Sequence, residues 1–111
     1  MEEKIKNITS EVYEELIKLF EGKIERIILY GSYARGDFNL ESDVDIMILL
    51  SCDQKEITQR RKEISRIASR IGLKNDIMVS LLARNCDDYQ NNMKYQPLYQ
   101  NIEKEGMKIY G

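Results

Sequence analysis

The sequence contains no histidine among its 111 residues, and it has only one proline and two cysteines. Without histidine, the chain cannot form a Ser-His-Asp triad, an imidazole general base or a zinc site with histidine ligands. Cys52 and Cys86 are too few for a zinc cluster or a disulfide framework, so we expect reduced thiols. Carboxylates are therefore the leading candidates for acid–base chemistry and for metal binding.

Long apolar runs and a strong net charge are also missing. No apolar run approaches the roughly 20 residues of a membrane-spanning helix, and the chain opens on acidic residues unlike a signal peptide. The formal charge of −2 gives no overall attraction to nucleic acid. We expect a cytoplasmic protein with no membrane partner and no direct nucleic-acid binding. At this length the chain forms a single domain over residues 1–111, with little left for a second substrate-binding domain.

Helical and strand patterns alternate along the chain and predict an α/β fold. We expect a small mixed sheet of three or four strands, with helices mainly on one face and the active cleft at the strand ends. The predicted helices span 2–21, 54–71 and 98–105, each followed by a glycine that ends it, and Pro97 fits the first helical position of the last. The predicted strands span 24–30, 44–50 and 76–82, and an edge strand is expected at 107–110. Residues 32–41 resemble a short helical turn and loop, and the polar segment 85–95 has no clear assignment.

Two aspartates stand at the start of the second predicted strand. Asp43 and Asp45 are two positions apart, and because side chains alternate along a strand both point to the same face, roughly 6 to 7 Å apart. At an effective dielectric near 20 such a pair repels by roughly 3 kcal/mol, which bound divalent cations would offset. Aspartate is disfavoured in strands, so this pair is less easily explained as solvated side chains than a lone aspartate would be.

Asp76 stands at the start of the third predicted strand. If the second and third strands are neighbours, its carboxylate comes close to the pair, and three carboxylates suit hard cations such as Mg²⁺. Two such ions can bracket the attacking and leaving oxygens of a phosphoryl displacement. Taken alone, Asp76 is about as well explained as a strand-end cap or a salt-bridge partner.

The first predicted strand runs into Gly31-Ser32, before a predicted helical turn. Exposed backbone N–H groups and the Ser32 hydroxyl can receive a phosphate there, and Gly31 lets a polyphosphate approach the backbone closely. A Gly-Ser turn is weak evidence by itself. Its value comes from the ten residues that separate Ser32 from Asp43, because this length allows the chain to return to an adjacent strand.

These residues carry a family resemblance. The segments Gly31-Ser32-Tyr33-Ala34-Arg35-Gly36 and Ser42-Asp43-Val44-Asp45 resemble the GSX10DXD signature of minimal nucleotidyltransferases, in the DNA polymerase β superfamily. Within it the chain is most similar to the MNT antitoxins that are paired with HEPN ribonuclease toxins, over nearly its whole length. The resemblance implies the polymerase β palm-like nucleotidyltransferase fold.

The resemblance also implies roles for the motif residues. Gly31 and Ser32 would hold the nucleoside triphosphate, and Asp43 and Asp45 would bind Mg²⁺, with two metal ions expected. Asp76 would be the third carboxylate, both as metal ligand and close to the incoming hydroxyl. Arg35 is a further candidate for nucleotide binding, although an internal salt bridge that fixes the motif loop explains it equally well.

The implied reaction is Mg²⁺-dependent transfer of AMP from ATP to a tyrosine hydroxyl of a HEPN toxin. Such a modification would silence the ribonuclease, making the chain an antitoxin that forms a hetero-oligomer with its toxin. One alternative is a non-catalytic antitoxin that neutralises its toxin by binding alone. Another is a nucleotidyltransferase acting on a small molecule such as an antibiotic, which the lack of an acceptor-binding domain disfavours.

Overall fold

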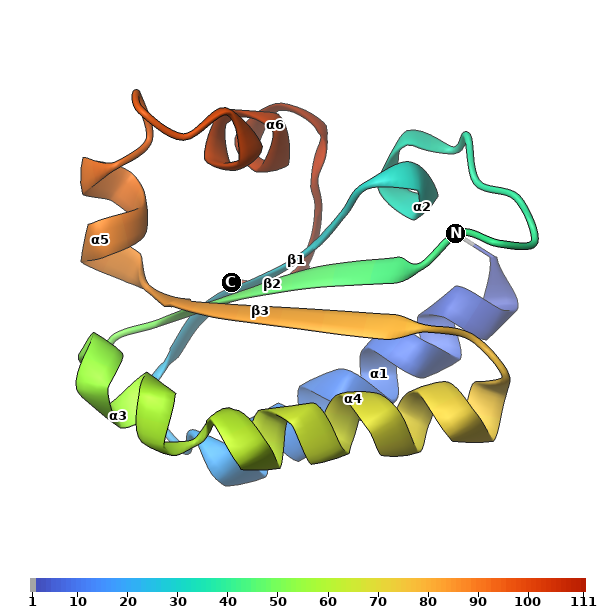
Figure 1. Ribbon diagram of the computed structural model, residues 1–111, viewed down its shortest axis with the longest axis horizontal. Helices are drawn as coiled ribbons and strands as arrows, with labels where there is room; N and C mark the ends of the chain where they lie inside the picture. The colour runs from blue at the N-terminus through green and yellow to red at the C-terminus, as the bar shows by residue number, and fades with distance from the viewer. Residues whose placement is uncertain (1) are drawn as a thin grey trace.

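Four strands form one mixed sheet in the order β3-β2-β1-β4 in the computed structural model, which describes residues 2–111 (Figure 1). The strands are β1 (Ile24–Tyr30), β2 (Val44–Leu50), β3 (Val79–Asn85) and β4 (Met107–Tyr110). β1 runs antiparallel to β2 and to β4, while β2 and β3 are parallel. The expected mixed α/β sheet is therefore confirmed, including the edge strand at 107–110.

Two long helices cover one face of the sheet. They are α1 (Glu3–Leu19) and α4 (Arg61–Asn75), and their apolar residues recur every three or four positions, so each buries one side on the strands. The strands contribute every second residue of β2 to the same core. This core includes Ile5, Ile8, Val12, Leu16, Val44, Ile46, Ile48, Leu50, Ile64, Ile67 and Ile71.

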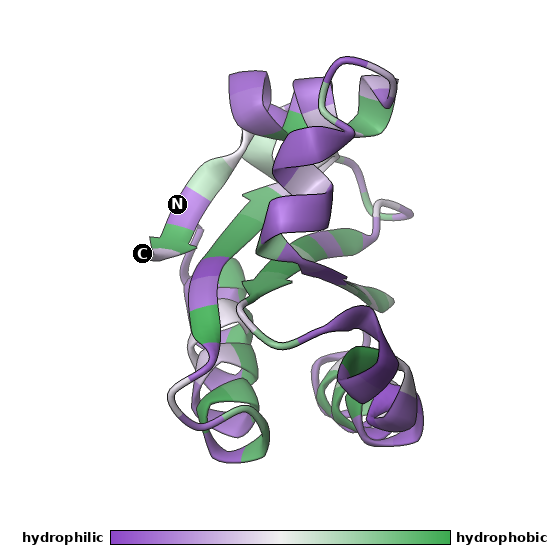
Figure 2. Ribbon diagram, turned by 90° about the vertical axis from the view of Figure 1, so that its left-hand side faces the viewer, coloured by the Kyte–Doolittle hydropathy of each residue, from purple (hydrophilic) through white to green (hydrophobic). Residues whose placement is uncertain are grey.

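The opposite face carries short helices. They are α5 (Cys86–Asn91) and α6 (Pro97–Glu105), and they enclose a second core with the other residues of β1 and β2. That core consists of Ile28, Met47, Leu49, Tyr89 and Ile102. Both faces of the central strands are thus apolar, and hydrophobic residues lie between the two helical layers in Figure 2. The helices are less confined to one face than expected, because the unassigned polar segment contains α5.

The connection between β2 and β3 differs from the prediction in two ways. The single helix expected at 54–71 is two helices, α3 (Gln54–Gln59) and α4, which meet at Arg60. Gly72 does not end the helix, because α4 continues to Asn75 and Asp76 terminates it in the left-handed conformation, at φ 52°. The third strand therefore begins at Val79, and the expectation that it begins at Asp76 is wrong.

None of the helices within residues 2–111 is both long enough and apolar enough to cross a membrane.

Candidate active site

The turn after β1 places a glycine against a carboxylate. Gly31 has φ 75° and ψ −156°, a backbone conformation that is essentially restricted to glycine. A Cβ atom at this position would lie 2.5 Å from Oδ2 of Asp45. The helix α2 (Ser32–Arg35) follows directly, and the first N–H groups of any helix lack partners within it. The Gly-Ser turn and Asp45 are therefore parts of one site.

Asp45 lies in the middle of a row across three strands. Its Cα partners are Tyr30 on β1 and Ser80 on β3, so the three side chains share the face covered by α5 and α6. Burial raises the pKa of the Asp45 carboxyl, and the negative charge of Asp43 raises it further, while Arg35 opposes this. Asp43 itself is exposed. The charge of Asp43 thus acts on Asp45, while the joint role of the two aspartates as metal ligands stays a prediction.

Tyr30 and Ser80 flank the carboxylate. Burial raises the pKa of the half-buried Tyr30 hydroxyl, and the charge of Asp45 contributes in the same direction. Ser80 is exposed and stands where the prediction placed the third carboxylate, beside Asp45 on the neighbouring strand. Sequence reasoning missed Ser80 because its position depends on the register of β3, which was placed three residues too early.

Asp76 lies apart from this row. It is an exposed residue at the C-terminal end of α4, and residues 2–111 contain no group of three acidic or thiol side chains placed to hold one metal ion. The proposed role of Asp76 as a third metal ligand therefore stays a prediction without geometric support. Asp76 does share a pocket with Asp43, of about 540 Å³, between α4 and the segments that precede β2 and β3.

Arg35 forms salt bridges inside the motif loop. Its Nε atom lies 3.1 Å from Oδ2 of Asp37, and its Nη1 atom lies 3.5 Å from Oε2 of Glu105 on α6. The internal salt bridge that the sequence left open is thus present, and Arg35 still acts on the site by lowering the pKa of Asp45. In the same loop Tyr33 stacks on Phe38, with ring centroids 4.5 Å apart.

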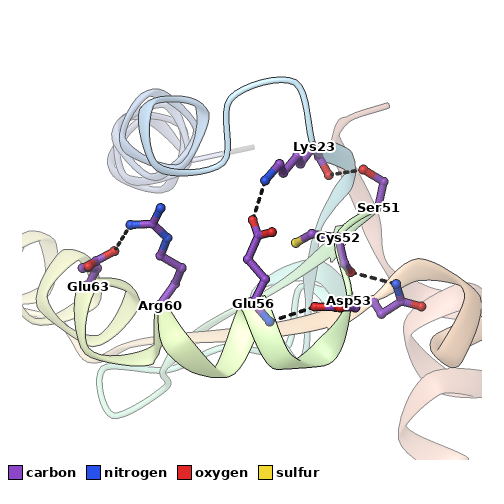
Figure 3. A network of polar contacts seen from close by, with 8 residues as sticks. Lys23, Ser51, Cys52, Asp53, Glu56, Arg60 and Glu63 are labelled. Atoms are coloured by element: carbon purple, nitrogen blue, oxygen red, sulfur yellow. Dashed lines mark hydrogen bonds and ion pairs between the residues drawn. The ribbon is translucent and has the colours of Figure 1, made fainter.

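A separate polar network lies at the opposite end of the central strands (Figure 3). Lys23 precedes β1 and its Nζ atom lies 2.6 Å from Oε2 of Glu56, on the helix that follows β2. Asp53 caps that helix by accepting a hydrogen bond from the Glu56 N–H group. Both cysteines are free thiols, as expected. These contacts join the segment that precedes β1 to the segment that follows β2, and they are remote from the aspartate pair at the start of β2.

Comparison with known proteins gives a consistent result. Residues 9–109 match the nucleotidyltransferase domain family. Two proteins of Methanocaldococcus jannaschii, MJ0141 and MJ0604, are named as candidate protein adenylyltransferases. MJ0141 is 41% identical over 73 residues, which cover 66% of this chain and 72% of that protein. MJ0604 is 28% identical over 91 residues, which cover 82% of this chain and 83% of that protein.

Solved structures share the fold. A toxin–antitoxin crystallised with AMP-PNP aligns over 93% of this chain and 73% of its own, with a TM-score of 0.63 and 21% identity. A second solved structure is a MntA–HpeT toxin–antitoxin variant with two Asp-to-Glu substitutions two positions apart. It aligns over 93% of this chain and 72% of its own, with a TM-score of 0.60 and 18% identity. These likenesses confirm the fold class. The family match over residues 9–109 confirms the nucleotidyltransferase resemblance that the GSX10DXD motif indicated.

Proposed function

Because this chain belongs to the nucleotidyltransferase domain family, we propose that it is a protein adenylyltransferase that acts as an antitoxin. In this proposal it transfers AMP from ATP to a tyrosine hydroxyl of a partner HEPN ribonuclease toxin, in the cytoplasm. The observation that carries the proposal is the contact of Gly31 with Asp45, because it joins the expected triphosphate-binding turn to the expected metal ligands. The names of the two Methanocaldococcus relatives support adenylyl transfer to protein.

The aspartate pair fits a divalent cation. Asp43 and Asp45 present hard oxygen ligands, and the pKa of Asp45 is raised by burial and by its neighbour's negative charge, a situation that a cation reverses. When bound, Mg²⁺ would supply charge neutralisation for the phosphates and lower the pKa of the acceptor hydroxyl. We therefore assign the metal to Asp43 and Asp45.

The transfer is a single displacement at the α-phosphorus. The tyrosine oxygen forms a bond to this phosphorus, and the bond to the oxygen that bridges to the β-phosphate breaks, so pyrophosphate leaves. Gly31 and Ser32 hold the leaving phosphates through backbone N–H groups and the hydroxyl. The phenolic proton goes to a carboxylate, and Asp76 is assigned this task because it lines a pocket together with Asp43.

A protein acceptor agrees with the solved neighbours. Two of them are toxin–antitoxin structures, one of them with AMP-PNP. In this proposal a toxin surface supplies the acceptor side of the site. The proposed assembly is therefore a hetero-oligomer of antitoxin and toxin.

The test is label transfer with purified proteins. The chain is incubated with Mg²⁺, ATP labelled at the α-phosphate and a candidate HEPN toxin, beside a reaction with ATP labelled at the γ-phosphate. We expect only the α-label to become bound to the toxin, and only with Mg²⁺ present. Asp43→Asn/Asp45→Asn should abolish transfer, whereas the matched variant Asp87→Asn/Asp88→Asn, two exposed positions on α5, should retain it.

Two other outcomes decide between the alternatives. A stable complex that inhibits the ribonuclease without label transfer contradicts the enzymatic proposal and leaves neutralisation by binding. Transfer to a small-molecule alcohol by the isolated chain, with none to the toxin, contradicts the choice of a protein acceptor.

A further inference from the structure

The pocket shared by Asp43 and Asp76 has an apolar rim. Its volume of about 540 Å³ lies within the range of roughly 300–1,000 Å³ found for ligand-binding clefts. Leu40, Leu73 and Met78 line it and are exposed by 105%, 85% and 66%. Leu40 and Leu73 are the two most exposed large hydrophobic residues described, and Met78 follows Tyr95, so this pocket gathers much of the exposed apolar surface.

The same pocket is acidic. Glu41, Asp43 and Asp76 line it, and within residues 2–111 none of the three forms an ion pair. The neighbouring cations of α4 do not compensate this charge, because Arg70 and Lys74 pair with Glu15 and Glu11 on α1. An occupant with apolar and positively charged groups would complement both properties.

Strand order places this pocket beside the aspartate pair. The Gly31-Ser32 turn follows β1, the aspartate pair belongs to β2, and the pocket wall of Ile77, Met78 and Val79 leads into β3, so β2 separates the pocket from the Gly-Ser turn along the sheet. The pocket is also walled by α4, which packs on the face of the sheet opposite to the Asp45 side chain, and Asp43 is the aspartate that the pocket shares with the site. An in-line displacement places the attacking oxygen opposite the leaving pyrophosphate, so an acceptor that enters from this pocket has to pass Asp43.

We propose that this pocket, here called the acceptor pocket, binds the polypeptide segment that carries the acceptor tyrosine. An apolar side chain of that segment inserts between Leu73 and Met78, and lysine or arginine residues nearby face Glu41. The tyrosine hydroxyl then reaches the edge of the pocket that Asp43 forms. This inference rests on the proposed adenylyl transfer and adds the chemistry by which the acceptor is recognised.

Peptide binding tests the acceptor pocket separately from catalysis. The probe is a fluorescent peptide with one tyrosine, one leucine and two lysines, and two matched peptides replace the lysines by glutamate or the leucine by serine. Anisotropy measures binding in the presence of Mg²⁺ and AMP-PNP. We expect the lysine–leucine peptide to bind most tightly, and its advantage over the glutamate peptide to shrink as salt is added.

Three variants locate the binding. Leu73→Ser should weaken the lysine–leucine peptide about tenfold, because it removes an apolar contact. Glu41→Lys should reverse the preference between the lysine and glutamate peptides. Leu98→Ser, a matched change at a 41% exposed leucine on α6, should leave binding unchanged. Leu73 and Glu41 are both exposed, so these variants are expected to fold.

The outcomes separate this inference from the proposed function. Equal binding of all three peptides, or binding unaffected by Leu73→Ser and Glu41→Lys, overturns the acceptor pocket even if label transfer to a toxin succeeds. A loss of AMP-PNP affinity in Leu73→Ser overturns it as well, because the pocket would then hold the nucleotide. Selective peptide binding without any transfer of α-label supports the docking surface and contradicts the adenylyltransferase activity.

Discussion

Gly31 links the two halves of the candidate site at the scale of a single residue. Its φ of 75° is unfavourable for other residues, and a Cβ atom would approach Oδ2 of Asp45 to 2.5 Å. We predict that Gly31→Ala lowers the free energy of unfolding by about 1–3 kcal/mol and abolishes label transfer, because the carboxylate must move. Denaturant unfolding and the α-label assay measure the two effects.

Gly36 provides the control for this prediction. It also has a positive φ, of 84°, but a Cβ atom there would meet nothing within 4 Å. Gly36 has the ordinary left-handed conformation, so Gly36→Ala should cost a backbone penalty of about 1–2 kcal/mol without displacing Asp45. If Gly31→Ala transferred label as well as Gly36→Ala does, the contact between the turn and Asp45 would have no catalytic importance.

Tyr89 gives a residue-scale prediction on pH. Its ring is fully buried in the second core, and its hydroxyl donates to the carbonyl oxygen of Tyr99 at 3.3 Å. Burial is the main cause that raises the pKa of Tyr89 to about 12. The folded state thus holds this proton more tightly than the unfolded state, whose tyrosines titrate near pH 10. The contribution of Tyr89 to stability is complete below about pH 10 and is lost as the pH rises towards 12.

Ultraviolet titration of the phenolate checks this expectation. Tyr89 should ionise last among the tyrosines, and the last step should disappear in Tyr89→Phe. Ionisation of every tyrosine in one step near pH 10, in protein that circular dichroism shows to be folded, is the contrary result.

The end of α4 shows at the scale of an element why a glycine can mislead. Gly72 is buried inside the helix, where a Cβ atom would lie 2.7 Å from the backbone oxygen of Ile77. Its function is close packing of α4 on the chain that returns to β3. Asp76 ends the helix instead, in the left-handed conformation that glycine adopts without strain.

Substitutions at these two positions should act in opposite directions. Alanine is favoured over glycine by about 1 kcal/mol inside a helix, yet Gly72→Ala should lower the free energy of unfolding by about 1–3 kcal/mol, because a backbone oxygen must move. Asp76→Gly should raise it by about 1 kcal/mol by relieving the left-handed residue. Denaturant midpoints decide the signs, and a stabilising Gly72→Ala would show that the helix end is free to adjust.

Local signals account for the part of the fold that the sequence predicts well. The strand before Gly31 and the strand that begins after Asp43 were predicted at their observed bounds, because β-branched runs and turn residues mark them. Ser80 and the acceptor pocket were not found. Both depend on the register of β3 against β2, which is set by packing between distant segments rather than by any local pattern.

At the scale of the whole molecule, the C-terminal segment adds the edge strand of the sheet and a helix over the strand that leads to the site. β4 pairs with the free side of β1, and α6 is tied to β1 and to the motif loop by the pairs Arg26–Glu103 and Arg35–Glu105. Ion pairs this exposed contribute at most about 1 kcal/mol each. The two buried cores therefore provide most of the stability, and the ion pairs orient α6 over the strand that ends at Gly31.

The unfavourable charge of the aspartate pair leads to a prediction for the stability of the whole molecule. The pKa of Asp45 is raised, so the folded state binds the Asp45 proton more tightly than the unfolded state does. The contribution of this proton to the free energy of unfolding is present at low pH and is lost as the pH rises above the usual aspartate range. At neutral pH, Asp43→Asn/Asp45→Asn should therefore raise the melting temperature of the ligand-free protein. Mg²⁺ and AMP-PNP at a hundred times their dissociation constant should stabilise the native chain by about 2.7 kcal/mol, and this variant by far less.

Thermal melts of both proteins, with and without ligand, measure the melting temperature of each protein and its shift on ligand binding. Asp87→Asn/Asp88→Asn is the matched control, because it removes two exposed carboxylates remote from the Gly31 turn and should retain the full ligand-induced shift. A variant that melts below the native chain without ligand would mean that Asp43 and Asp45 serve the fold. A variant that melts higher and no longer responds to Mg²⁺ and AMP-PNP would mean that the chain accepts repulsion between two carboxylates in order to hold a metal–nucleotide complex.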